Sequence, residues 1–173
     1  MSLNFKGLLQ NVKAFVFDID GVFSHQVWLH PSGEFMRSLN GKDSFAVQYA
    51  VKKGFHIAII SGGRCETMRM HFEQLGVTDI YLKSSNKIHD FDNFLNKYQL
   101  KPEHILYMGD DLPDYEIMKK AGIPTCPADA ADEIKSVSVY ISYKTGGEGC
   151  VRDVIEQTLR VQEQWMHPDA FSW

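Results

Sequence analysis

The sequence predicts an α/β protein built on a doubly wound parallel sheet, and two patterns indicate this fold. Short apolar runs, rich in β-branched and aromatic residues, alternate with amphipathic helical segments of about ten residues. Glycine and polar turn residues separate the runs from the helices that follow them. This alternation is typical of βαβ units, whose right-handed crossovers cover both faces of a parallel sheet.

The elements follow one another without a repeat or a low-complexity segment. After an amphipathic lead-in at residues 4–10, strands are expected at about residues 12–18, 56–60, 80–82, 105–108, 123–126 and 137–141. Helices are expected after an N-cap at Asp43 or Ser44, at about 65–75, from Asn86 to about Tyr98, from Pro113 to Gly122, and at about 151–165.

Residues 22–39 interrupt the alternation and predict a β-hairpin projecting from the end of the first strand. The turn signal Pro31-Ser32-Gly33 divides two runs that contain Trp28 and Phe35. A lone two-stranded hairpin is marginally stable in water. We therefore expect its apolar side to pack on this domain or on a neighbouring subunit.

Composition limits the classes of protein to consider. The chain has 173 residues, of which 44% are hydrophobic and 23% charged, as in one globular domain spanning residues 1–173. A net charge of −4 argues against a general nucleic-acid binder. No run approaches the roughly 18 apolar residues of a membrane span, and the first residues do not resemble a signal peptide. The three cysteines are far apart. We therefore expect a cytoplasmic protein with no nucleic-acid or membrane partner.

Two carboxylates mark the end of the first strand. Asp18 and Asp20 are one residue apart and share a face of an extended chain, and Gly21 lets the backbone turn at once. In an open α/β sheet, ligands bind beyond the carboxyl ends of the strands. Paired carboxylates repel each other unless a hard cation such as Mg²⁺ lies between them. Two solvated acids at a strand end are the alternative interpretation.

Further polar residues follow other strands of the predicted sheet. Ser61 follows the strand at 56–60, and Lys87 lies at the start of the helix after the strand at 80–82. The acids Asp110, Asp111 and Asp114 follow the strand at 105–108. Taken singly, they are also typical of turn serines, solvated lysines and helix caps. Together they predict phosphoryl transfer: a carboxylate nucleophile, a general acid, and a hydroxyl and a lysine on the phosphate.

Four motifs in this order resemble those of the haloacid dehalogenase superfamily. They are Asp18-Ile19-Asp20-Gly21, Ser61, Lys87 and Gly109-Asp110-Asp111-Leu112-Pro113-Asp114. The resemblance spans about residues 12–165. It implies that Asp18 is the nucleophile and Asp20 the general acid and base, and that Ser61, Gly62 and Lys87 bind the phosphate.

The resemblance also implies a Mg²⁺ cofactor. Its ligands would be Asp18, the backbone carbonyl of Asp20, and Asp110. Asp111 and Asp114 would orient the metal shell or the lysine.

Superfamily members differ in cap domains, and this chain has no room for one. The intervals 21–61 and 61–87 hold only the elements listed above. Capless members of this size resemble the 3-deoxy-D-manno-octulosonate 8-phosphate (KDO 8-phosphate) phosphatases of lipopolysaccharide synthesis. The hairpin and the segment Gly146-Gly147-Glu148-Gly149-Cys150-Val151-Arg152-Asp153 are similar to theirs. That resemblance implies a homotetramer in which a neighbouring subunit, often with its C-terminal tail (here about 146–173), closes each site on a small sugar acid phosphate.

One departure concerns the substrate. The family often carries arginine directly after the serine-glycine of the second motif, where this chain has Gly63. Arg64, Arg69 and Arg152 are the candidates for the substrate carboxylate, since a guanidinium fork suits that group. Because of this departure, membership in a related branch, which acts on nine-carbon sugar acid 9-phosphates, is the alternative. The residues Met166–Trp173 match no motif.

A signalling receiver domain is the alternative from another class. Receivers share the doubly wound sheet, the aspartyl phosphate, the hydroxyl, the lysine and Mg²⁺, but they place the phosphorylated aspartate after the third strand. Here that strand is followed by Lys83 and Ser84, with no acid.

Overall fold

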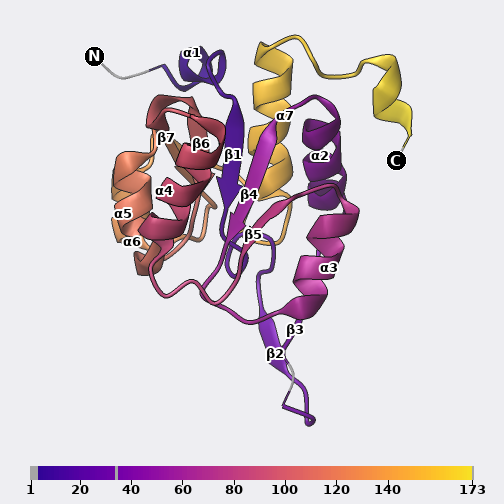
Figure 1. Cartoon of the computed structure of the whole chain (residues 1–173), viewed down its shortest axis with the longest axis vertical. Helices are drawn as coiled ribbons and strands as arrows, with labels where there is room; N and C mark the ends of the chain where they lie inside the picture. Colours follow the sequence, from indigo (N-terminus) through magenta and orange to yellow (C-terminus); the bar gives the residue numbers. More distant parts are fainter. Residues whose placement is uncertain (1–3, 34, 173) are drawn as a thin grey trace.

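Six parallel strands form the central sheet in the part of the chain that the structure describes, a computed structural model covering residues 4–33 and 35–172. Their order is β5-β4-β1-β6-β7-β8, with β1 between β4 and β6 (Figure 1). The strands are β1 (Ala14–Phe17), β4 (His56–Ile60), β5 (Asp79–Tyr81), β6 (Ile105–Met108), β7 (Ile123–Cys126) and β8 (Tyr140–Ile141). The predicted doubly wound sheet is therefore confirmed.

Helices cover both faces of this sheet (Figure 1). They are α1 (Phe5–Leu9), α2 (Gly41–Lys52), α3 (Glu66–Gln74), α4 (Lys87–Tyr98), α5 (Tyr115–Lys120), α6 (Asp132–Val137) and α7 (Cys150–Val161), with 3₁₀ turns η1 (Pro102–His104), η2 (Leu112–Asp114) and η3 (Pro168–Phe171). Phe15 and Phe17 point into the layer of α2, α3 and α7, whereas Ala14 and Val16 point into the layer of α4, α5 and α6. All four are fully buried, so β1 is the axis of two cores.

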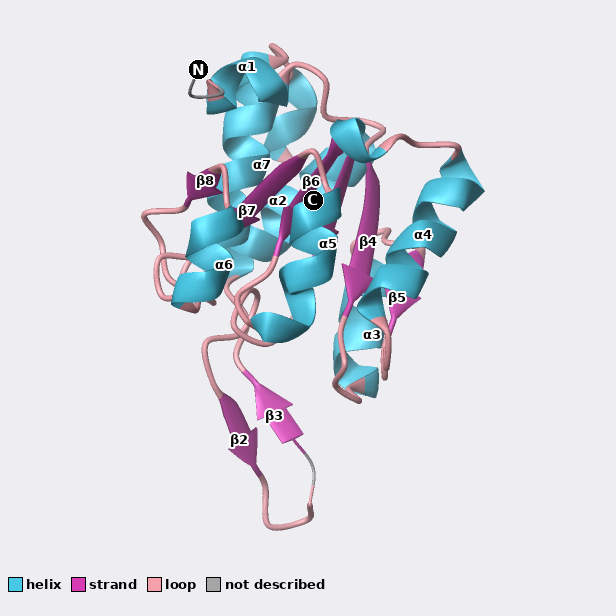
Figure 2. Ribbon diagram, turned by 90° about the vertical axis from the view of Figure 1, so that its left-hand side faces the viewer, coloured by secondary structure: helices cyan, strands magenta, loops and turns pink. Residues whose placement is uncertain are grey.

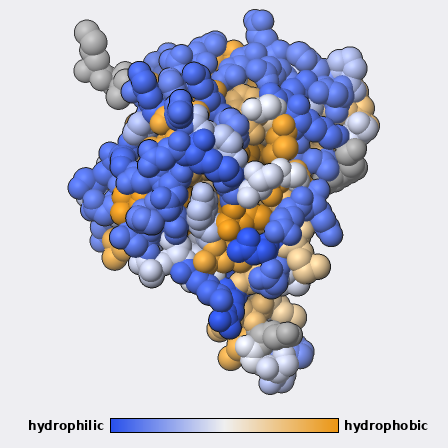
Figure 3. All heavy atoms as spheres, in the orientation of Figure 1, coloured by the Kyte–Doolittle hydropathy of each residue, from blue (hydrophilic) through white to orange (hydrophobic). Residues whose placement is uncertain are grey.

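The predicted hairpin projects from the end of the sheet at which the strands terminate (Figure 2). It consists of β2 (Val27–Leu29) and β3 (Phe35–Arg37), which pair antiparallel. Its apolar side chains are exposed, from 41% for Val27 to 68% for Leu29. Figure 3 shows this apolar surface on the protruding arm. The hairpin does not fold back on its own domain, which leaves it available to another molecule.

Three predicted boundaries were wrong. The N-cap of α2 is Asn40, whose side chain accepts a hydrogen bond from Lys42 N at 2.9 Å, while Asp43 is buried inside the helix. The strand expected at 137–141 is two residues long, because α6 comes first. Six residues are too few to display a helical period. The last helix ends at Val161 rather than at 165.

The segment that follows Gly146 belongs to the core of its own chain. Val151, Val154 and Leu159 of α7 are fully buried against α2 and the sheet. Residues 162–172 then run along α2 at the end of the molecule away from the hairpin (Figure 1). Tyr49 donates to the carbonyl of Gln164 at 3.0 Å, which fixes that return. Among the described residues, no helix has the length and hydropathy needed to span a bilayer.

Asp43 ties α2 to the start of α7. Its Oδ1 accepts from the backbone N–H of Arg152 at 2.6 Å, while its buried Oδ2 has no hydrogen-bond partner in the described part of the chain. Burial raises the pKa of Asp43 from 3.8 to about 6, against the opposing effect of hydrogen bonds from Arg152 and Gly149. The folded state therefore binds this proton more tightly than the unfolded state does, and ionisation of Asp43 lowers the stability as pH rises from about 4 to about 6.

We expect Asp43→Asn to remove this pH dependence, because the amide oxygen keeps the bond to Arg152 and no charge is buried. From pH 4 to pH 6, the variant should gain about 2–3 kcal/mol of unfolding free energy relative to the wild type. Urea unfolding at a series of pH values measures the difference. Asp132→Asn is the control, since that carboxylate is fully exposed. Parallel stability curves for Asp43→Asn and the wild type would contradict the assignment.

Candidate active site

The strand ends and the hairpin base enclose a cavity of about 370 Å³. It contains eight of the residues singled out from the sequence: Asp18, Asp20, Ser61, Gly62, Lys87, Asp110, Asp111 and Asp114. Ser24, His25 and Val27 line the side toward the hairpin. Residues from three strand ends and one helix start thus share one cavity, because β4, β1 and β6 are parallel neighbours.

Lys87 is the cation at the centre of this cavity. Its Nζ lies 2.7 Å from Oδ1 of Asp114 and 3.0 Å from Oδ1 of Asp18. The lysine side chain is 7% exposed. Burial lowers the pKa of Lys87, but the carboxylates of Asp18 and Asp114 more than offset this effect, so the pKa is raised. Lys87 is therefore charged at neutral pH.

Asp114 fixes the geometry of the acidic loop after β6. Its Oδ1 accepts from Lys87 and from the hydroxyl of Tyr107 at 2.6 Å, and its Oδ2 accepts from the backbone N–H of Asp110 at 3.1 Å. Asp111 instead caps η2, because its Oδ1 accepts from Leu112 N at 2.8 Å. Both oxygens of Asp114 are committed to protein donors, as expected for an orienting residue.

Asp18, Asp110 and Asp114 bring ligand oxygens within 4.8 Å of one another. Burial, and next the charge of Asp114, raise the pKa of Asp18 to about 8 and that of Asp110 to about 7, while Lys87 lowers both. Among the described residues, the buried Oδ1 of Asp18 has the ion pair with Lys87 but no contact with the geometry of a hydrogen bond. Close carboxylates suit a hard divalent cation, which offsets their repulsion.

Glycines let the backbone approach these carboxylates closely. Gly21 has φ +82°, and a Cβ there would lie 1.9 Å from Oδ2 of Asp110. A Cβ on Gly146 would lie 1.9 Å from the carbonyl oxygen of Gly21, and one on Gly147 would lie 2.5 Å from His25 N. The glycine pair before α7 therefore packs on the loop that carries Asp20 within the same chain.

Ser61 lies at the end of β4 and is 2% exposed. Its Oγ accepts from the backbone N–H of Gly63 at 3.1 Å, and its own N–H donates to Tyr81 O. The side chain thus stabilises the turn at Gly62 and Gly63 while it faces the cavity.

The comparisons with known proteins agree with this geometry. Residues 65–154 match the haloacid dehalogenase-like hydrolase family. The KDO 8-phosphate phosphatase of Escherichia coli strain K12 is 31% identical over 154 residues, which are 88% of this chain and 82% of that protein.

The chain belongs to the haloacid dehalogenase-like hydrolases.

Solved structures support the same placement. The KDO 8-phosphate phosphatase of Yersinia pestis superposes with a TM-score of 0.90 at 28% identity, over 92% of this chain and 87% of that one. The enzyme of Moraxella catarrhalis, in complex with magnesium, phosphate and KDO, superposes with a TM-score of 0.90 at 28% identity, over 96% and 95%. This hydrolase is a phosphoric monoester hydrolase of the superfamily, and its described residues form no cap domain.

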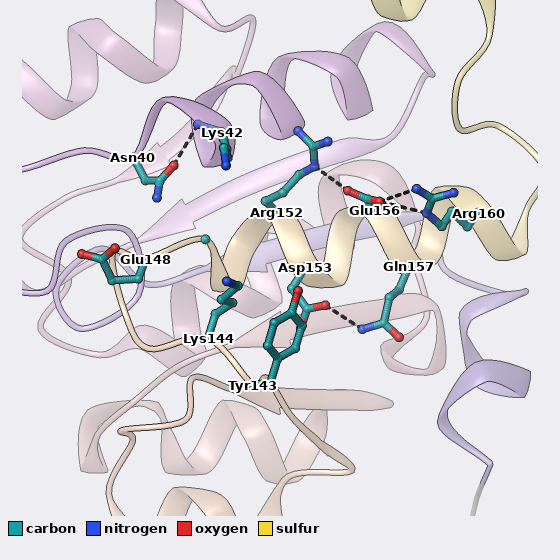
Figure 4. A pocket seen from close by; sticks show the side chains of 11 residues that line it. Asn40, Lys42, Tyr143, Lys144, Glu148, Arg152, Asp153, Glu156, Gln157 and Arg160 are labelled. Carbon is teal, nitrogen blue, oxygen red and sulfur yellow. Dashed lines mark hydrogen bonds and ion pairs between the residues drawn. The ribbon is translucent and has the colours of Figure 1, made fainter.

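The three arginines predicted to read the substrate do not line the cavity of this hydrolase. Arg64 is exposed, and Arg69 donates to Ile80 O at 3.3 Å. Arg152 lines a separate cavity of about 600 Å³ between α7, the start of α2 and the segment that precedes α7, where it pairs with Glu156 (Figure 4). That second cavity shares no lining residue with the first.

One arginine that reaches the site residues was not predicted from the sequence. Arg37, the last residue of β3, donates to Oδ1 of Asp20 from Nε at 2.6 Å and to Oδ2 from Nη2 at 2.9 Å. Gly63, at the position where the family often has arginine, was the signal in the sequence that the groups beside this turn differ here.

We expect Gly21→Ala to lower kcat by at least about 100-fold, since the added Cβ must displace Asp110. Gly54→Ala is the matched control. Gly54 also has positive φ, at +85°, but a Cβ there meets no atom within 4 Å. Both variants carry the backbone penalty of about 1 kcal/mol. Steady-state kinetics and melting temperatures separate the two effects, and equal kcat values for both variants would contradict the contact.

Proposed function

We propose that this hydrolase removes phosphate from a small sugar acid phosphate, KDO 8-phosphate, with Mg²⁺ held by Asp18, the carbonyl of Asp20, and Asp110. The observation that supports this proposal is the acidic cluster: Lys87 contacts Asp18 and Asp114, and ligand oxygens of Asp18, Asp110 and Asp114 lie within 4.8 Å of one another. Relatives of the chain are KDO 8-phosphate phosphatases. Mg²⁺, when bound, would supply positive charge between the carboxylate and phosphate oxygens.

In the first step, Oδ of Asp18 attacks phosphorus and the ester oxygen leaves with a proton from Asp20, which produces an aspartyl phosphate. In the second step, water gives a proton to Asp20 and attacks the same phosphorus. The P–O bond to Asp18 breaks, and inorganic phosphate and the free carboxylate result. Lys87 stabilises charge on the transferred group, while Ser61 and the N–H of Gly62 hold its oxygens.

We also propose that the chain is a single catalytic domain that assembles as a homotetramer through its hairpins. The exposed side chains of Trp28, Leu29 and Phe35 form an apolar surface, and none of the described residues of β2 and β3 belongs to either core. A neighbouring subunit at this position would bury that surface and shield the open cavity, as a cap domain does elsewhere in the superfamily. The contacts of residues 162–172 with their own α2 argue for the neighbour's hairpin, rather than its tail, as the shield.

A nine-carbon sugar acid 9-phosphate is the second candidate substrate, and the glycine at position 63 is the observation that supports it. The family's usual arginine is absent from that position, so the part of the substrate beyond the phosphate meets different groups here.

Phosphate release from KDO 8-phosphate and from a nine-carbon sugar acid 9-phosphate, side by side, tests the substrate. We expect a preference of at least tenfold in kcat/KM for the eight-carbon ester, about 1.4 kcal/mol of transition-state binding, and loss of turnover in EDTA that Mg²⁺ restores. Asp18→Asn keeps the shape of the nucleophile and should abolish turnover of both. The opposite preference would assign the enzyme to the nine-carbon branch. Full activity in EDTA would contradict the requirement for Mg²⁺.

Trp28→Asp should dissociate the oligomer, because it places a charge in the apolar surface of the hairpin. Light scattering coupled to size-exclusion chromatography measures the mass. Tyr143→Asp is the control, since Tyr143 is 74% exposed but lies outside the hairpin. A Trp28→Asp variant with an unchanged tetramer mass, or a monomeric wild type, would refute the hairpin interface.

A further inference from the structure

Arg37 and Asp20 form the one two-bond contact between the hairpin and the catalytic motifs in the described part of the chain. Nε and Nη2 each donate to a different oxygen of the carboxylate, at 2.6 and 2.9 Å. This fork-to-fork arrangement restricts rotation of both side chains, which a single hydrogen bond does not. The side chain of Arg37 is 5% exposed, so water competes little for these bonds.

Gly63 provides the space in which this pair lies. A Cβ at that position would be 3.0 Å from Nη2 of Arg37 and 3.2 Å from Oδ2 of Asp20. Both distances are shorter than ordinary van der Waals contacts. A side chain at position 63 therefore requires the ends of Arg37 and Asp20 to shift by a few tenths of an ångström, which would disturb the geometry of the pair.

Asp20 has few other groups to hold it. Its backbone forms a bridge with Ser24, but Arg37 supplies the side-chain hydrogen bonds that the structure gives its carboxylate. That carboxylate is 36% exposed and lines the cavity beside Asp18. Without the guanidinium, it is free to turn toward solvent.

We propose that Arg37 is a positioning residue: it holds the carboxylate of Asp20 in place for proton transfer, and Gly63 is small so that it can do so. The inference rests on the proposed role of Asp20 as general acid and base. Arg37 belongs to the hairpin, so this contact also makes the position of Asp20 depend on where the hairpin lies.

A double-mutant cycle on Arg37 and Gly63 tests the proposal. Arg37→Met keeps the apolar stem and removes every donor, and it should lower kcat by roughly 10- to 100-fold with KM changed less than about twofold. Gly63→Ala should lower kcat severalfold by displacing the pair, yet have no effect in the Arg37→Met background. Arg37→Lys restores one donor and should recover part of kcat. Arg160→Met, which removes an exposed arginine outside the active-site cavity, is the control and should behave as wild type.

The assays use both the sugar acid phosphates and p-nitrophenyl phosphate. A failure of the proposed substrate can then be distinguished from a failure of the positioning role of Arg37. If the wild type cleaves only the aryl ester, the substrate proposal fails and the cycle is read with that ester. Additive losses for the two substitutions, a change in KM alone, or wild-type kcat in Arg37→Met would overturn the positioning role. If Arg37→Met does not fold, Arg37→Lys and Gly63→Ala decide, and wild-type kcat in both overturns it.

Discussion

The contact of Lys87 with two buried carboxylates is the interaction on which this site depends. One lysine charge lies among Asp18, Asp110 and Asp114, and the remaining negative charge is not compensated by the described residues. Removing such charges from water costs several kcal/mol per ion unless partners surround them. Burial accordingly raises the pKa of Asp18 and of Asp110. This excess of carboxylates over cations is consistent with the divalent cation of the proposed function.

The fold supplies the rigidity that this cluster needs. Asp18 extends from β1, which has partners on both sides and is buried on both faces. Lys87 begins α4, and Asp114 is fixed by the buried hydroxyl of Tyr107 on β6. Each charged group is thus attached to an element that core packing holds in place, which is how preorganised electrostatics is maintained. The hairpin is the exception, since it contributes Arg37 from outside both cores.

Local patterns predicted most of the fold and the polar residues of the site. Buried β-strands read as continuous apolar runs, so β4, β6 and β7 were located to the residue, and their ends located Ser61 and Asp110. The short helix α6 was missed because its six residues show no period. Arg37 was missed because its value comes from a contact across 17 positions of the chain, which depends on how the hairpin returns. Arg152 lines a different cavity from Asp18 within this chain, and sequence proximity to a glycine motif does not reveal the direction of a side chain.

The structure also changed the interpretation of the C-terminal segment that begins at Gly146. The glycines at 146 and 147 were interpreted as the start of a C-terminal tail that closes a neighbouring site, yet within this chain another backbone lies against each of them. The helix that follows, α7, completes a core, and Asp43 accepts a hydrogen bond from the backbone N–H of Arg152 in its first turn. The region links the loop of Asp20 to α2, and its sequence pattern reflects close packing within one chain.

Thermal unfolding with and without Mg²⁺, on the wild type and on Asp110→Asn, tests the central claim most directly. At a Mg²⁺ concentration about 100 times its Kd, binding to the folded state should add about 2.7 kcal/mol to the free energy of unfolding. This corresponds to a rise of several degrees in Tm. Asp110→Asn should be at least as stable as the wild type without metal, because it removes one repelling carboxylate, and should gain little from Mg²⁺. An equal Mg²⁺ shift in both proteins, or none in the wild type, would contradict a cation site at this cluster.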